Sequence, residues 1–228
     1  MAGRRSVAAV AFAALAASAS GAWADSAGVF TFTVSRNGDP IGEHRVAFRH
    51  EGSRIEIDAA TELKVTFAMI PVFRFSHQRR EVWQDGRPLL IAARTDSDGH
   101  KLDITLRPNG HGYIRTVNDR VDRLDPTTKI LAFWIRDTVT ADPARFVSVV
   151  EDETLEVAFS YLGKQTLTIA GRQLEADHYR MLGDEERDIW YDPDGQVARV
   201  TFLRDGAEIE YLRNEYHSAP LTTVKMPQ

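Results

Sequence analysis

The chain has 228 residues, with 28 basic and 33 acidic side chains, a formal net charge of −5 at pH 7, and no cysteine. The lack of cysteine excludes disulfides, thiol catalysis and thiolate metal sites. A mixed, slightly acidic composition argues against nucleic-acid partners and against a basic face that docks on membranes. We therefore expect a protein whose stability comes from a hydrophobic core alone.

The first 24 residues have the composition of a signal peptide. Arg4 and Arg5 supply positive charge, the Ala-rich stretch 7–17 is apolar, and Ala22-Trp23-Ala24 fits an A-x-A cleavage site. The apolar stretch is shorter than the ~20 residues that a transmembrane helix needs. We predict cleavage after Ala24, export to a periplasm, and no transmembrane segment. An uncleaved N-terminal anchor is the alternative.

The next part of the chain alternates between apolar and polar residues. Phe30, Phe32 and Val34 alternate with polar residues and lead into Asn37-Gly38, a strong signal for a hairpin turn. In the longest pattern, every odd position from 55 to 69 is apolar or Thr. A period of two indicates a strand with one face in a core and the other in water. The stretch greatly exceeds the usual strand length of ~5–6 residues, so we expect a long strand that bends.

Further alternating segments separated by turns follow, which predicts successive antiparallel hairpins. Pro71 should bend the long strand, because proline lacks the backbone N–H that a ladder needs. Asp125-Pro126 has the residues of a helix start, and the apolar run after it has no period of two. One short helix is therefore expected near 126–135, and strands resume from Phe146.

These elements predict an all-β fold: a single antiparallel meander of roughly ten to twelve strands that curls into an open β-barrel or half-barrel. The single domain is expected over residues 25–220, with a loose C-terminal tail over 221–228. The sequence leaves open whether the barrel closes and how many chains associate.

No catalytic motif of the nucleophile-elbow, phosphate-loop or metalloprotease type appears in the sequence. The seven histidines lack the spacing that would direct two strand residues at one metal, and the carboxylates cluster in turns. We predict no catalytic residue, no metal and no cofactor. His44 and His77 stand out because they fall on strand faces otherwise filled by Phe and Val. A hydrogen-bonded histidine at the edge of the core is the simpler interpretation of both, and contact with a ligand is the alternative.

The aromatic residues are the remaining candidates for a site. A barrel of this size either fills its interior with them or uses them to line a cavity for an apolar ligand, and the sequence leaves both open. If there is a cavity, we predict that six residues form its wall. These residues are Phe67, Phe73, Phe75, His77, Trp83 and Trp134. The segment that carries Trp134 would close the cavity.

Three segments, 38–45 (GDPIGEHR), 79–87 (RREVWQDGR) and 188–195 (DIWYDPDG), carry a family resemblance. They resemble a family of exported alphaproteobacterial proteins of unknown function, over a range from about Phe30 to Tyr211. The resemblance implies no activity, substrate or site residue. In architecture the chain is also distantly similar to half-barrel lipoprotein carriers, which hold acyl chains against a concave sheet. Those carriers have a substantial helical lid, for which this chain offers only the short predicted helix.

These observations favour a non-enzymatic periplasmic protein that binds an apolar or amphipathic envelope molecule, such as a lipid, on the concave face of its sheet. One alternative is an envelope scaffold or assembly protein with a filled core and a protein partner. Another is a hydrolase or isomerase with an unrecognised site around His44 or His77. A cavity above ~300 Å³ lined by the aromatics would favour the first function, and a filled interior the second.

Overall fold

The computed structural model describes residues 26–134, 136–139 and 142–215, so the predicted signal peptide and C-terminal tail lie outside the described residues. The described residues form one fifteen-stranded sheet, which confirms the predicted all-β fold and antiparallel meander. The strand count exceeds the expected ten to twelve, because several short strands lack a clear alternating pattern. The strands are β1 (Ser26–Arg36), β2 (Asp39–Glu51), β3 (Arg54–Phe67), β4 (Ile70–Gln84), β5 (Arg87–Ser97), β6 (His100–Pro108), β7 (Tyr113–Val117), β8 (Arg120–Leu124), β9 (Lys129–Ile130), β10 (Ala144–Val147), β11 (Thr154–Ile169), β12 (Arg172–Gly183), β13 (Arg187–Tyr191), β14 (Val197–Arg204) and β15 (Ala207–Arg213).

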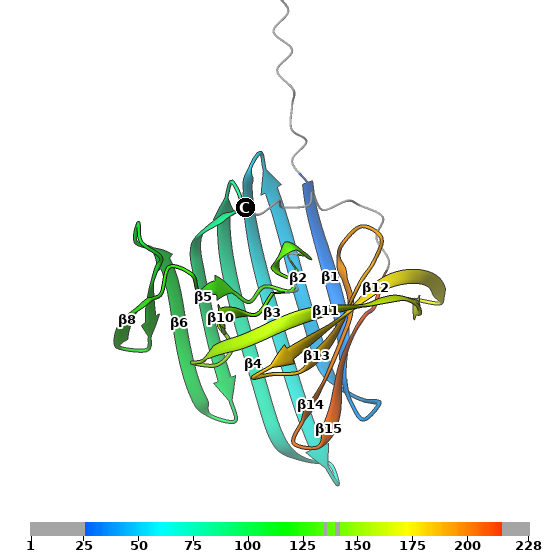
Figure 1. Cartoon of the computed structure of the whole chain (residues 1–228). Coiled ribbons are helices and arrows are strands. Elements are labelled where there is room, and N and C mark those ends of the chain that lie inside the picture. The colour runs from blue at the N-terminus through cyan, green and yellow to red at the C-terminus, as the bar shows by residue number, and fades with distance from the viewer. Residues whose placement is uncertain (1–25, 135, 140–141, 216–228) are drawn as a thin grey trace, which may run out of the picture.

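The order of strands in the sheet follows the order in the chain, with one exception. Strands β1 to β8 are consecutive neighbours, as are β9 to β15, and β1 pairs with β15 to join the two halves. The two edges of the sheet are therefore β8 and β9, which only residues 125–128 separate in the chain. The long strands β1 to β6 form one broad curved layer, and β11 to β14 cross in front of it (Figure 1). The sheet thus wraps around an interior without closing.

Irregular pairing accounts for the curvature. Register shifts interrupt the β1–β2, β3–β4, β4–β5, β11–β12 and β13–β14 pairs. Each such bulge locally increases the twist of a strand. The shift between Val65 and Thr66 places Thr66 opposite Pro71, where the sequence predicted a bend.

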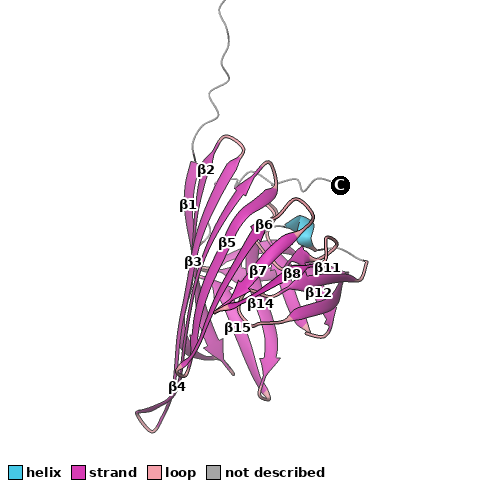
Figure 2. Cartoon of the chain, turned by 90° about the vertical axis from the view of Figure 1, so that its left-hand side faces the viewer, coloured by secondary structure: helices cyan, strands magenta, loops and turns pink. Residues whose placement is uncertain are grey.

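The predicted long strand is two strands. The chain turns back at Ala68-Met69, so β3 and β4 form a hairpin that extends beyond the rest of the sheet (Figure 2). Both turn residues adopt positive φ, 48° and 67°, without being glycine. The sequence did not predict this turn, because Ala68 and Met69 continue the alternating pattern and are not typical turn formers.

The prediction of a short helix near 126–135 was wrong. Asp125 accepts hydrogen bonds from the backbone N and the hydroxyl of Thr127, at 2.8 and 2.6 Å, and these form a local turn. The next residues pair with β10 as the parallel strand β9 instead of continuing a helix. A single 3₁₀ turn, η1 (Arg136–Thr138), follows. Among the described residues no helix is long and apolar enough to cross a bilayer.

Candidate functional site

A cavity of about 840 Å³ lies inside the curved sheet. Its wall comes from strands β1 to β4 on one side, from β13 to β15 on the other, and from residues 131–134, Arg136 and 148–151. Most of the residues that line it are apolar, and many are aromatic. The aromatic carbocycles and indoles in the wall belong to Phe30, Phe32, Phe48, Phe73, Phe75, Phe133, Trp134, Phe202 and Tyr211.

The structure brings four of the six predicted wall residues to this cavity: Phe73, Phe75, His77 and Trp134. Trp83 is fully buried and does not line the cavity, because Trp134 covers it with an edge-to-face contact at 5.3 Å between ring centroids. Phe67 ends β3, opposite Ile70, and its side chain lies outside the described residues.

A row of four polar side chains crosses the concave face. His44, Thr61, His77 and Thr95 lie directly opposite one another on β2, β3, β4 and β5. The Nδ1 atom of His44 lies 2.8 Å from the Thr61 hydroxyl, and that of His77 lies 2.9 Å from the Thr95 hydroxyl. Both histidines also line the cavity. Each therefore has the hydrogen-bonded setting expected from the sequence and a position from which it could contact a ligand.

The hydrogen bonds of Thr95 determine the tautomer of His77. The Thr95 hydroxyl donates its single proton to the carbonyl oxygen of Val150, at 3.1 Å. It can therefore only accept from His77, so the Nδ1 atom of His77 carries the proton. In this neutral tautomer the Nε2 atom has no proton and can only accept a hydrogen bond. His77 is 5% exposed, and Nε2 has no hydrogen-bond partner among the described residues.

An ion pair lies beside this row on the same face of β4. The Nε atom of Arg79 lies 2.8 Å from a carboxylate oxygen of Glu81, which is 1% exposed. Glu81 also accepts from the indole N–H of Trp83 at 2.6 Å and of Trp134 at 3.2 Å. The carboxylate therefore anchors the loop that carries Trp134 to β4, and it compensates the charge of Arg79, which lines the cavity.

Sequence reasoning missed Arg79 and Glu81. The period of two places both on the same face as Phe75, His77 and Trp83. Continuing the alternation from Phe75 across the run of charges would have found them.

The surroundings keep both histidines of the row neutral. Burial lowers the pKa of His77 to about 3 and that of His44 to about 4, and the positive charge of Arg79 acts in the same direction on each. A hydrogen bond to the backbone of Ala60 partly opposes the change at His44. At pH 7 both imidazoles are therefore uncharged, and Arg79 is the cation beside them.

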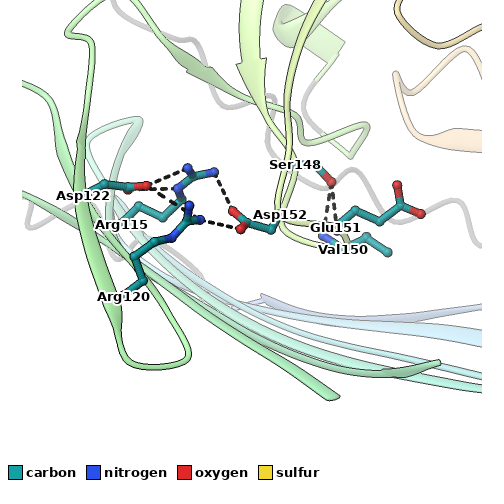
Figure 3. A network of polar contacts seen from close by, with 7 residues as sticks. All are labelled: Arg115, Arg120, Asp122, Ser148, Val150, Glu151 and Asp152. Carbon is teal, nitrogen blue, oxygen red and sulfur yellow. Dashed lines mark hydrogen bonds and ion pairs between the residues drawn. The ribbon is translucent and has the colours of Figure 1, made fainter. Parts of the chain in front are cut away.

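A loop of residues 148–153, here called the bridging loop, closes one end of the site. Its Ser148 hydroxyl oxygen accepts from the backbone N of Val150 and Glu151, at 3.3 and 3.2 Å. Its Asp152 forms ion pairs with Arg115 on β7 and Arg120 on β8 (Figure 3). Because the loop follows β10, these contacts join the two unpaired edge regions of the sheet.

Comparisons with known proteins agree with the β fold. The crystal structure of a β-barrel-like protein of domain of unknown function DUF1849 from Brucella abortus is similar to this chain, with a TM-score of 0.60 and 9% sequence identity. The similarity covers 82% of this chain and 94% of that chain, and at such low identity it shows the fold alone. No curated protein matches this sequence. Residues 32–214 match the family described as Domain of unknown function (DUF6134), which confirms the predicted resemblance to an uncharacterised family. The chain therefore belongs to the DUF6134 family.

Proposed function

We propose that this protein binds an apolar or amphipathic molecule of the bacterial envelope inside its curved sheet, without catalysing a reaction on it. The observation that supports this function is the cavity of about 840 Å³ with its aromatic wall. Protein interiors are close-packed and contain few voids larger than a water molecule. The volume falls within the ~300–1,000 Å³ typical of small-molecule sites, so it supports ligand binding over the alternative of a scaffold with a filled core.

Export to a periplasm is part of the same proposal. Its support is the signal-like composition of the first 24 residues, with the cleavage site at Ala24. A periplasmic location would place the protein among lipids and other amphipathic molecules. The mass of the protein recovered from the periplasm tests this directly, because cleavage after Ala24 leaves a chain that begins at Asp25.

Native mass spectrometry of the periplasmic protein, purified without detergent, tests the proposed function. We expect an added mass that organic extraction releases as a lipid or another apolar molecule. A bare protein mass, with no binding after total envelope lipid is added back, would contradict the proposal and direct the search to protein partners.

A pair of variants on β3 links any bound mass to the cavity. Ala59 lines the cavity, and Ala60 is the next residue on the same strand, where alternation places its side chain on the opposite face. Ala59→Phe should fill part of the cavity and reduce the bound fraction several-fold. Ala60→Phe adds the same side chain outside and should bind as the native protein does. Equal binding by both variants would show that the mass is bound elsewhere.

A further inference from the structure

We propose that the ligand of the cavity carries a carboxylic acid head group, and that Arg79 and His77 bind this group while its apolar chain lies against the aromatic wall. This inference rests on the proposed function and names the chemical class of its ligand. The polar row and the Arg79–Glu81 pair together form a built polar site within an otherwise mainly apolar cavity.

Arg79 supplies the donors of this site. A guanidinium has five N–H donors in a fixed fork, which matches the two oxygens of a carboxylate. The Nε atom lies 2.8 Å from a carboxylate oxygen of Glu81 without the alignment of a hydrogen bond, and Arg79 lines the cavity. Glu81 is already engaged by Arg79 and by two indole N–H groups. The positive side of the pair is therefore the side available to a ligand in the cavity.

His77 supplies an acceptor, and this narrows the choice of head group. Its buried Nε2 atom has a lone pair, because the ring proton is on the side of Thr95, and it has no hydrogen-bond partner among the described residues. A ligand that satisfies both residues must offer an acceptor to Arg79 and a proton to Nε2. A carboxylic acid does both, with one oxygen toward Arg79 and a proton shared between the other oxygen and Nε2. An ester offers only acceptors, and a cationic head would be repelled by Arg79.

Arg79 is the dominant charged group around His77. On its own strand, Glu81 is paired with Arg79, and β3 and β5 contribute only the hydroxyls of Thr61 and Thr95. The neighbouring titratable group on β2 is His44, which is neutral at pH 7.

The bridging loop contributes the carbonyl of Val150 beside Thr95, and its Glu151 forms an ion pair with Arg204 at 2.6 Å. No unpaired acid of the described residues adjacent to this row therefore competes with a ligand carboxylate for Arg79.

The proposed complex takes up one proton when a carboxylate binds at neutral pH. Free His77 is unprotonated, and a free long-chain acid is ionised, so the shared proton comes from solvent. Because binding takes up a proton, the affinity for the acid rises as the pH falls, by up to tenfold per pH unit. This holds over the pH range in which free His77 and the free acid are both deprotonated. An alcohol or a methyl ester of the same chain carries no such dependence.

Calorimetric titration of the mature, delipidated protein with a C16 carboxylic acid, its alcohol and its methyl ester tests the inference. We expect the acid to bind at least about tenfold more tightly than the ester at pH 6, with uptake of about one proton measured in buffers of different ionisation enthalpy. His77→Asn is the informative variant, because the Asn amide can replace Nδ1–H toward Thr95 while Nε2 is removed. It should lose the preference for the acid and the proton uptake, with ester affinity kept within about twofold.

His100→Asn is the matched control, since His100 is an exposed histidine outside the cavity. It should keep both the preference and the proton uptake. A measurement without any variant is ¹⁵N NMR of the histidines, in which the acid should convert His77 Nε2 from a bare to a protonated nitrogen.

The outcomes separate this inference from the proposed function. Equal affinity for acid, alcohol and ester, without proton uptake or change at Nε2, would overturn the head-group assignment while leaving an apolar ligand in place. Failure of all three probes and of total envelope lipid to bind would overturn both.

Discussion

At the scale of single residues, the interior of this protein holds polar groups whose pairing depends on protonation. His44 and His77 are neutral inside the sheet, but the same side chains in an unfolded chain have a pKa near 6.5. Below that pH the unfolded chain binds more protons than the folded one, so acid favours unfolding. Glu81 and Arg79 present the opposite case, in which two charges are kept inside because each compensates the other.

The first prediction concerns acid stability. The free energy of unfolding should fall as the pH is lowered from 7.5 to 5, since folding holds the pKa of His77 at about 3 and that of His44 at about 4. With about 1.4 kcal/mol per pKa unit, each histidine accounts for about 2 kcal/mol of the loss at pH 5. Urea unfolding of His77→Asn should show a pH dependence smaller by about that amount. His100→Asn, at an exposed histidine, should match the native protein, and an unchanged dependence in His77→Asn would contradict the assignment.

The second prediction concerns the buried ion pair. Glu81→Gln removes the charge that compensates Arg79 and should destabilise the fold by about 3 kcal/mol, as is usual for one broken half of a buried pair. Removing both charges, in Glu81→Gln with Arg79→Gln, should recover part of that loss. The measurement is a double-mutant cycle from urea unfolding. Additive losses would show that the two residues do not interact energetically.

At the scale of elements, the hairpins explain both what could be predicted and what could not. Asn37-Gly38 and Asp205-Gly206 have positive φ at both positions, as the favoured two-residue hairpin turns require. The residues of Asn37-Gly38 identified that turn in the sequence. Ala68-Met69 adopts the same backbone with residues that avoid it, so the strain marks the turn only once the structure is known. The tip that results leaves Met69 96% and Ile70 66% exposed.

The third prediction follows from that strain. The double substitution Ala68→Asn with Met69→Gly puts Asn-Gly, the residues that this backbone favours, into the β3–β4 turn. It should stabilise the protein by about 1 kcal/mol. For a chain of this size the expected rise in Tm is about 2–4 °C. The reverse exchange at β1–β2, Asn37→Ala with Gly38→Met, should lower Tm. A lower Tm for the first variant would mean that the exposed tip makes contacts worth more than the strain.

At the scale of the whole molecule, the sheet stays open and its edges are joined by side chains. No backbone pairing links β8 with β9 among the described strands, whereas Asp152 of the bridging loop forms ion pairs with Arg115 and Arg120. Arg115 also binds both oxygens of Asp122, at 3.0 and 2.8 Å, and this lowers the pKa of the Asp122 carboxyl. That contribution to stability is present above the unfolded pKa and is lost as the pH falls through the lowered folded value.

The fourth prediction tests the role of the bridging loop. Asp152→Asn should weaken both ion pairs, costing about 1 kcal/mol of overall stability, and should speed amide hydrogen exchange in residues 148–153. Because Val150 accepts from Thr95, the loosened loop should also expose the polar row. Asp103→Asn removes a surface ion pair with Arg94 elsewhere on the sheet and should leave exchange in the loop unchanged. Equal exchange in native and Asp152→Asn protein would show that the backbone alone holds the loop.

The sequence by itself determined the all-β class and the antiparallel order, because a period of two and Gly-containing turns are local properties of the chain. Only the tertiary structure decided that β1 pairs with β15 and that the interior is not filled. It also decided that Trp134 covers Trp83 and reaches the Glu81 carboxylate. These features depend on side chains far apart in sequence: the indole N–H of Trp134 donates to Glu81, 53 residues away in the chain, and a local pattern does not record such a partner.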